Sequence, residues 1–138
     1  MRAHLDANFF IRFVEARDDG VVTFFGRAVD QGVGLVTSEI TLLEVLTGAL
    51  KEGNAVGAAA FERLLASDGS FVETRPIDRT VLRRAAEGRV SLGNKAPDAI
   101  HVATAELAEC DVMVTSDAKM KLPPSLRRCA LVDLGTLL

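Results

Sequence analysis

Four acidic residues of this 138-residue chain are spaced so that one folded domain could gather them at a single site. Two of them follow short apolar segments that are predicted to be strands, and the other two lie in the first and second turns of predicted helices. They are Asp6, Glu44, Asp98 and Asp117. Carboxylate oxygens are hard ligands, so a cluster of them suits Mg²⁺ or Mn²⁺ far better than zinc.

The carboxylates can share one edge if the strands are parallel, and the sequence favours a parallel sheet. Residues 112–114 form an uninterrupted apolar run, typical of a strand that is covered on both faces. A predicted helix precedes this run, opening with Pro97 and Asp98, which suit the first turn and the positive end of the helix dipole. Ligands bind beyond the carboxyl ends of parallel strands, where Asp6 and Asp117 are expected to project.

The rest of the chain alternates predicted strands with predicted helices. Further strands are expected at 35–37, 71–74 and 130–134. Ser38 is a good N-cap for a long amphipathic helix, and another helix is expected to end around Gly88. This alternation predicts a three-layer α/β/α sandwich on a mostly parallel sheet of four or five strands.

Length and composition favour one compact domain that spans residues 1–138. Hydrophobic residues make up 49% and charged residues 25%, values that fit a globular protein and not a disordered one. The two cysteines give no disulfide framework, and the N-terminus carries no export signal, so the cytoplasm is the expected location. No apolar run approaches the roughly 20 residues that a membrane helix needs. The net charge of -3 argues against non-specific coating of nucleic acid but does not exclude a nuclease.

Each acid also has a purely structural interpretation. Asp6 and Asp117 could be helix N-caps, and Asp98 could serve only to complement a helix dipole. Glu44 is harder to explain in this way, because it lies in the apolar stretch 42–46 and is expected to point toward packed structure. A buried, unpaired carboxylate is costly, and a bound metal ion is one way to compensate it.

Four further polar residues lie beside the acids in sequence. Asn8 could cap a helix or hydrogen-bond an acid, and Thr115 and Ser116 could bind a metal-linked water or act as capping hydroxyls. His101 lies one helical turn beyond Asp98 on the same face. We expect it to be a supporting or structural histidine and not a general base.

Three segments of the chain resemble the PIN-domain ribonucleases, specifically the toxins of VapBC-type toxin–antitoxin pairs. They are APDAIHVATA with the strand and TSD that follow it, LDAN at residues 5–8, and TLLEVLTGA at residues 41–49. The resemblance covers nearly the whole chain and implies a PIN-like fold. It also implies that Asp6 and Asp98 are the main ligands of one or two divalent metals. Glu44 and Asp117 would complete the set, directly or through water.

The same resemblance implies an endoribonuclease that acts as the toxin of its pair. The expected partners are an RNA substrate, a cognate VapB-like antitoxin and a second copy of the chain in a homodimer. The expected cofactor is Mg²⁺ or Mn²⁺. One departure concerns Ser116, where many relatives carry Asn before the last acid.

Two alternatives stay open from the sequence. A catalytically weak PIN fold could bind RNA or protein without cleaving it. A phosphatase of the haloacid-dehalogenase class also places an aspartate after its first strand. That class needs a second aspartate two residues later, where this chain has Asn8.

Overall fold

A parallel sheet forms the centre of the computed structural model, which describes residues 1–68 and 71–138. Within these residues, five strands are hydrogen-bonded in the order β3-β2-β1-β4-β5, and every neighbouring pair is parallel. The strands are β1 (Arg2–Leu5), β2 (Gly34–Ser38), β3 (Glu73–Arg75), β4 (Val112–Val114) and β5 (Arg127–Cys129). The predicted parallel sheet of four or five strands is therefore confirmed.

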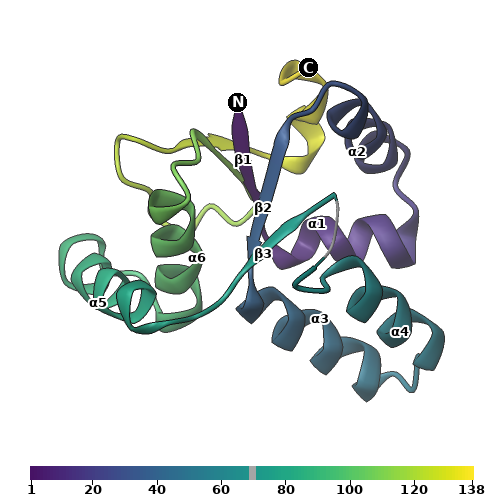
Figure 1. The fold of residues 1–138 in the computed structure, drawn as a ribbon, viewed down its shortest axis with the longest axis horizontal. Helices are drawn as coiled ribbons and strands as arrows, with labels where there is room; N and C mark the ends of the chain where they lie inside the picture. Colours follow the sequence, from purple (N-terminus) through teal and green to yellow (C-terminus); the bar gives the residue numbers. More distant parts are fainter. Residues whose placement is uncertain (69–70) are drawn as a thin grey trace.

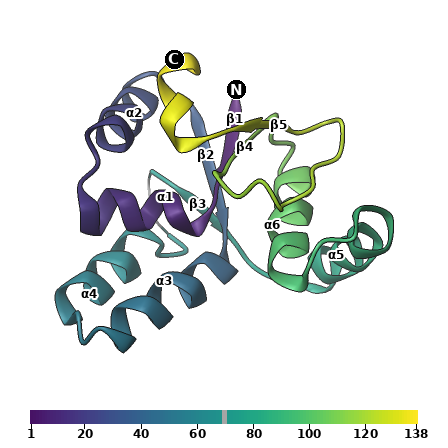
Figure 2. The same ribbon diagram turned by 180° about the vertical axis from the view of Figure 1, so that it is seen from behind.

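Helices cover both faces of this sheet (Figures 1 and 2). On one side lie α1 (Ala7–Ile11), its π-helical extension η1 (Arg12–Ala16), α2 (Asp19–Asp30), α3 (Glu39–Lys51) and α4 (Ala55–Leu64). On the other side lie α5 (Arg79–Leu92) and α6 (Ala96–Leu107). A 3-10 helix, η2 (Leu131–Thr136), completes the described elements. The predicted three-layer α/β/α sandwich is confirmed.

The core has two parts because successive strand residues point to opposite faces of the sheet. Leu5 and Val114 belong to the larger cluster, which α1, α2 and α4 cover. Val36 and Met113 belong to a second cluster against α6. His4, between two core residues of β1, is fully buried on this second face. A histidine there must find hydrogen-bond partners inside the protein.

Capping residues set several helix boundaries as expected. The Ser38 hydroxyl accepts a hydrogen bond from the amide of Ile40 at 3.1 Å and starts α3. Pro97 lies in the first turn of α6. The predicted end of α5 near Gly88 is wrong, because the helix runs on to Leu92. It ends at Gly93, whose φ of 77° is the left-handed conformation that favours glycine after a helix.

The predicted strand at residues 130–134 is also wrong. The last strand, β5, lies earlier at Arg127–Cys129, and the apolar residues after it form η2. Leu131 and Leu134 are both buried, and η2 packs against α2. A spacing of three residues places both leucines on one side of a 3-10 helix, which a strand cannot do. Among the described helices, none is long and apolar enough to span a bilayer.

Candidate functional site

Asp6 lies at the junction of β1 and α1, at the carboxyl end of the central strand. Its side chain is only 8% exposed, and its Oδ1 accepts a hydrogen bond from the amide of Phe9 at 3.4 Å. Burial raises the pKa of Asp6, while a hydrogen bond from the Thr115 hydroxyl opposes that increase. Asp6 is therefore an N-cap, as one interpretation predicted. It is also a buried acid whose charge is incompletely compensated.

Asp98 lies in the first turn of α6 and is partly exposed. Burial and the negative charge of Asp117 raise its pKa, and Glu44 raises it further. Lys95 acts in the opposite direction. The negative charges of Asp117 and Glu44 both act on the Asp98 carboxylate. Carboxylates from the loop after β4 and from α3 therefore converge on the start of α6.

The loop after β4 holds Asp117 through several hydrogen bonds. The backbone amide of Asp117 donates to the Thr115 hydroxyl oxygen at 3.1 Å, and its Oδ1 accepts from the amide of Lys119 at 2.9 Å. Arg128 on β5 donates to the Asp117 carbonyl at 2.7 Å. Thr115 is buried and also hydrogen-bonds to Asp6, so one hydroxyl connects the carboxylate of Asp6 with the backbone of Asp117. Asp117 itself is exposed and caps a turn, not a helix.

The other hydroxyl of this loop has a different partner. Ser116 accepts a hydrogen bond from the backbone amide of Leu131 at 3.0 Å, which fixes the chain after β5. Asn8 is exposed on the first turn of α1, and its backbone amide is one of the groups that lower the pKa of Asp6. The Ser116 hydroxyl therefore holds the chain after β5, and the contact of Asn8 with Asp6 is made by its backbone.

Glu44 does not point into packed structure, contrary to our prediction. Its side chain is 37% exposed, and its Oε1 lies 2.7 Å from Nε2 of His101. The apolar neighbours were misleading because α3 buries Ile40 and Val45 but exposes Leu43. Glu44 lies at the boundary of the buried face and reaches α6 along the surface.

His101 connects Glu44 with the buried His4. Its Nδ1 lies 3.0 Å from Nε2 of His4, and both rings are buried. The predicted supporting position of His101 fits these contacts. We did not predict a role for His4 from the sequence, although its place between two core residues of a short strand could have indicated one.

Asn94 is a second polar residue that sequence reasoning missed. It is buried just before α6, where its side-chain amide donates to the Lys121 carbonyl and accepts from the Lys121 amide, both at 2.8 Å. This pair of bonds joins the segment that precedes Asp98 to the loop that carries Asp117. No local pattern in the sequence signals it.

We expect Asn94→Ala to lower the free energy of unfolding by roughly 1–3 kcal/mol, because two partly buried hydrogen bonds to the backbone of Lys121 would be lost. Urea denaturation of the metal-free protein measures the change. Asn8→Ala is the matched control. Since Asn8 is exposed, its loss should change stability by no more than about 0.5 kcal/mol. Equal stability of the two variants would show that the two bonds to Lys121 contribute little.

The acidic edge has the donor chemistry of a divalent metal site but not a closed set of ligands. In residues 1–68 and 71–138, no three His, Cys, Asp or Glu side chains are grouped so that they could hold a metal ion. The donors are nonetheless all hard oxygens, and the pKa of Asp98 is raised by burial and, to a smaller extent, by the negative charges of Asp117 and Glu44, which a cation would offset. The residue types and their electrostatics fit a hard divalent cation, with Asp6, Glu44, Asp98 and Asp117 as the candidate ligands.

A sequence match extends over most of this architecture. The sequence profile of the PIN domain matches residues 3–124, a range that contains all four candidate acids. The chain belongs to the PIN-domain family. This membership confirms the resemblance noted in the sequence, and it removes the haloacid-dehalogenase alternative. No curated protein matches the sequence.

Several solved structures share the PIN fold of this chain. A toxin–antitoxin complex from Klebsiella pneumoniae is 23% identical, with a TM-score of 0.69, and the match covers 91% of this chain and 95% of that chain. VapBC2 from Rickettsia felis, bound to a promoter DNA fragment, is 19% identical with a TM-score of 0.73 and coverages of 94% and 98%. DNA-bound VapBC from Salmonella typhimurium is 18% identical with a TM-score of 0.71 and coverages of 95% and 98%. At these identities the likeness is one of fold.

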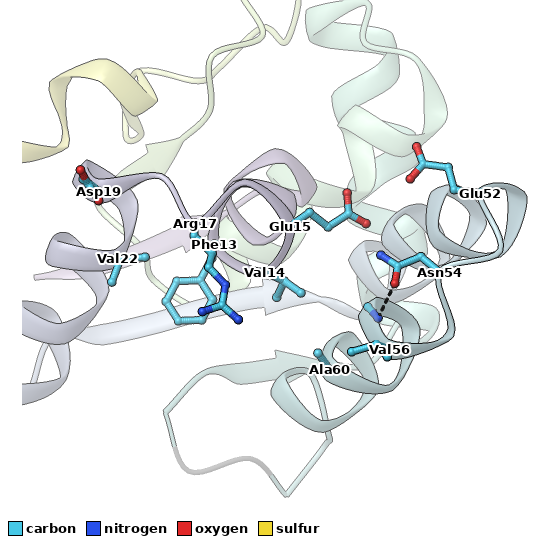
Figure 3. Close-up of a pocket in the computed structure, with 11 residues that line it drawn as sticks. Phe13, Val14, Glu15, Arg17, Asp19, Val22, Glu52, Asn54, Val56 and Ala60 are labelled. Atoms are coloured by element: carbon cyan, nitrogen blue, oxygen red, sulfur yellow. Dashed lines mark hydrogen bonds between the residues drawn. The ribbon is translucent and has the colours of Figure 1, made fainter.

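A groove of about 810 Å³ lies away from the acids, between η1, α2 and α4 (Figure 3). Phe13 and Val14 on η1 lie opposite Val56 and Ala60 on α4. Charged side chains, including Glu15, Arg17 and Glu52, also line it. None of the four candidate acids lines this groove, so it is distinct from the acidic edge.

Proposed function

We propose that this PIN domain is a metal-dependent endoribonuclease and the toxin of a VapBC-type toxin–antitoxin pair. PIN domains are generally nucleases, and the four acids lie within the matched region. The observation that carries the proposal is the convergence of carboxylates on Asp98, whose pKa is raised by burial and then further by the negative charges of Asp117 and Glu44. Such an uncompensated cluster of carboxylates is suited to bind a hard cation beside a phosphodiester.

In this proposal Asp6 and Asp98 would be the main ligands of Mg²⁺ or Mn²⁺, and Glu44 and Asp117 would complete the set. The bound ion would supply a water of lowered pKa and would offset charge on the phosphate, leaving a 5′-phosphate and a 3′-hydroxyl. Residues of the chain would orient these ligands. Amides of α1 and the Thr115 hydroxyl orient Asp6.

Three further groups would orient the acids or attract the substrate. Hydrogen bonds to Arg128 and Thr115 fix the backbone at Asp117. Lys95 is exposed and close enough to lower the pKa of Asp98, so its ammonium group can attract the RNA backbone to the acidic edge. Lys95 thus places a positive charge beside the acids of a chain whose net charge is -3.

The test is cleavage of RNA by the purified protein in millimolar Mg²⁺ or Mn²⁺ and in excess EDTA. We expect cleavage with either ion and its loss on chelation, because four carboxylates alone offer no electrophile to the phosphate. Protein that carries Asp98→Asn and is purified in the same way controls for contaminating ribonuclease. Cleavage that persists in EDTA with the wild type but not with the variant would overturn the metal mechanism.

A second candidate is a PIN fold that binds RNA or protein without cleaving it. One observation favours it, since the described side chains form no ready group of three ligands. Calorimetric titration with Mn²⁺ separates the two functions. Binding that Asp98→Asn removes supports the nuclease, and the absence of any Mn²⁺ binding supports the binding module.

The proposed antitoxin would dock partly in the groove between η1, α2 and α4. The apolar and charged residues that line this groove suit an amphipathic segment of a partner chain. The structural neighbours from Klebsiella pneumoniae and Rickettsia felis are described as a toxin–antitoxin complex and as VapBC2, respectively. Expression of the chain alone should slow growth, and co-expression with the antitoxin should restore it.

We expect Val56→Asp to weaken the antitoxin complex by at least about tenfold, because the substitution would place a charge in an apolar contact. Val56 is 82% exposed in the free chain and lines the groove, so the folded toxin should tolerate the change. Val90→Asp on α5 is the matched control, since Val90 is 89% exposed and lies outside the groove. Calorimetry of each variant with purified antitoxin gives the dissociation constants. Equal weakening by both variants would place the antitoxin elsewhere.

The proposed homodimer has a candidate surface on α3. Leu43 and Leu50 are both largely exposed, and their spacing of seven residues puts them on one side of the helix. The two leucines supply apolar surface that a partner could cover. A second copy of the chain would cover them in a two-fold interface.

A further inference from the structure

Three polar side chains form a hydrogen-bonded chain that leads from the interior to the acidic edge. His4 on β1 lies 3.0 Å from His101 on α6, and His101 lies 2.7 Å from Glu44 on α3. Both histidines are buried, whereas Glu44 is partly exposed. Since neither histidine is a proposed metal ligand, the chain needs a separate explanation.

The direction of the outer hydrogen bond follows from the chemistry of its two groups. An ionised carboxylate has no proton to donate, so Nε2 of His101 carries hydrogen and donates to Oε1 of Glu44. The other nitrogen of His101, Nδ1, faces Nε2 of His4. One of these two nitrogens must donate to the other.

The surroundings of His4 decide which nitrogen donates. Its Nδ1 is buried and has no hydrogen-bond partner among the described residues. If Nε2 of His4 accepted, then Nδ1 would carry the hydrogen of a neutral ring and would be a buried donor without an acceptor. If Nε2 donates, then Nδ1 carries only a lone pair. Buried donors without partners are rarer than unpaired acceptors, so His4 donates to His101. Both rings are then neutral and protonated on Nε2.

We propose that His101 is a positioning residue that holds Glu44 at the acidic edge, and that His4 sets the ring of His101 in the tautomer that can do so. This inference rests on the proposed function. Asp6 and Asp98 have short side chains in or beside the first turn of a helix, and that of Asp6 accepts from the amide of Phe9. Glu44 is longer and partly exposed, so its carboxylate needs a partner to stay in one place. The bond to Oε1 leaves Oε2 available as a ligand.

The first test measures the affinity of untagged protein for Mn²⁺ alone by calorimetry. We expect His101→Leu to weaken binding roughly tenfold, the scale seen when a group that orients a metal ligand is lost. His101→Gln should stay within about threefold of the wild type, because its amide can still donate from the position of Nε2. Thr104→Val is the matched control for a lost buried polar group on α6. Thr104 donates only to the carbonyl of Ile100, so this change should leave Mn²⁺ affinity unaltered.

The second test is independent of metal and RNA. The chain has two histidines, so long-range ¹H–¹⁵N spectra of the untagged protein contain only two imidazole rings. At pH 7.5 and without metal, we expect both rings as the Nε2–H tautomer. We also expect His4→Phe to abolish that uniform tautomer at His101. A ring of His101 protonated on Nδ1 in the wild type would overturn the proposed role of His4.

The outcomes separate this inference from the proposed function. If His101→Leu binds Mn²⁺ as tightly as the wild type, the positioning role is wrong even when the protein cleaves RNA. If the protein binds Mn²⁺ with the expected order of variants but cleaves no RNA, the positioning role stands and the nuclease proposal fails. Should His101→Leu not fold, His101→Gln and the spectra of the wild type still decide.

Discussion

Asp98→Asn is expected to abolish RNA cleavage, with single-turnover rates falling by on the order of 10³-fold, or about 4 kcal/mol in the barrier. Asparagine keeps the shape of the side chain and its place in the first turn of α6, but it removes the charge that a divalent cation would neutralise. Asp6→Asn should have a comparable effect. End-labelled RNA in saturating Mn²⁺ gives the rates, and saturation separates lost chemistry from weak metal binding.

The matched control for this loss is Asp111→Asn. Asp111 is an exposed acid that immediately precedes β4, whereas Asp117 follows that strand, so the two lie at opposite ends of the sheet. Among the residues that the structure describes, its carboxylate accepts from the backbone amide of Arg2 alone, and the variant should keep wild-type activity. If Asp98→Asn retained more than about a tenth of the wild-type rate, Asp98 would not be a principal ligand. The principal ligands would then have to be sought among Asp6, Glu44 and Asp117.

The sheet and its helices could be predicted because their determinants are local. The apolar run of β4, the capping hydroxyl of Ser38 and the proline at the start of α6 each act within a few residues of sequence. The alternation of such signals was enough to predict parallel strands. From parallel strands it followed that Asp6 and Asp117 leave the sheet at the same edge.

The errors arose where local patterns are ambiguous. An apolar run after β5 can be a buried strand or a 3-10 helix, and packing of Leu131 and Leu134 against α2 decided for the helix. Gly88 resembles a helix terminator, yet the required left-handed residue is Gly93. Glu44 is surrounded by leucines in sequence, but only some of them face the core.

The hydrogen bonds that support the candidate site could not be predicted, because they join residues that are distant in sequence. His4 and His101 are 97 positions apart, and Glu44 and His101 are 57 apart. Asn94 contacts the carbonyl and amide of Lys121. Because these are backbone groups, the contact does not depend on the residue type at position 121, and no sequence pattern reveals it. Which acids can share a cation depends on these tertiary contacts as well as on the carboxylates themselves.

The second large effect concerns stability without metal, for which Asp6→Asn is the informative variant. Burial raises the pKa of Asp6 above its ordinary value of 3.8, so its charge opposes folding when no cation is bound. Asparagine can still cap α1 through the Phe9 amide and can still accept from Thr115. We expect the variant to melt roughly 2–4 °C above the wild type in EDTA at pH 7.5.

The pH dependence follows from the same shift. Because the folded-state pKa of Asp6 lies above the unfolded value near 3.8, the folded protein holds more protons than the unfolded chain between those two values. The stability of metal-free wild type should therefore rise as pH falls through that window and decrease as pH rises through the folded pKa. Asp6→Asn should lose this part of the pH dependence. Asp98 shifts in the same direction, but solvent screens it more, so its share is smaller.

Millimolar Mg²⁺ should reverse the order of the two melting temperatures. A ligand at about 100 times its dissociation constant adds roughly 2.7 kcal/mol to the protein that binds it, and less to a variant with weakened affinity. Thermal melting of both proteins in EDTA and in Mg²⁺ therefore tests Asp6 as a ligand and as a buried charge that opposes folding in one experiment. Suppose Asp6→Asn melted below the wild type in EDTA and Mg²⁺ left the gap unchanged. Asp6 would then be only the N-cap of α1, and the cation would have to be sought between Asp98 and Asp117.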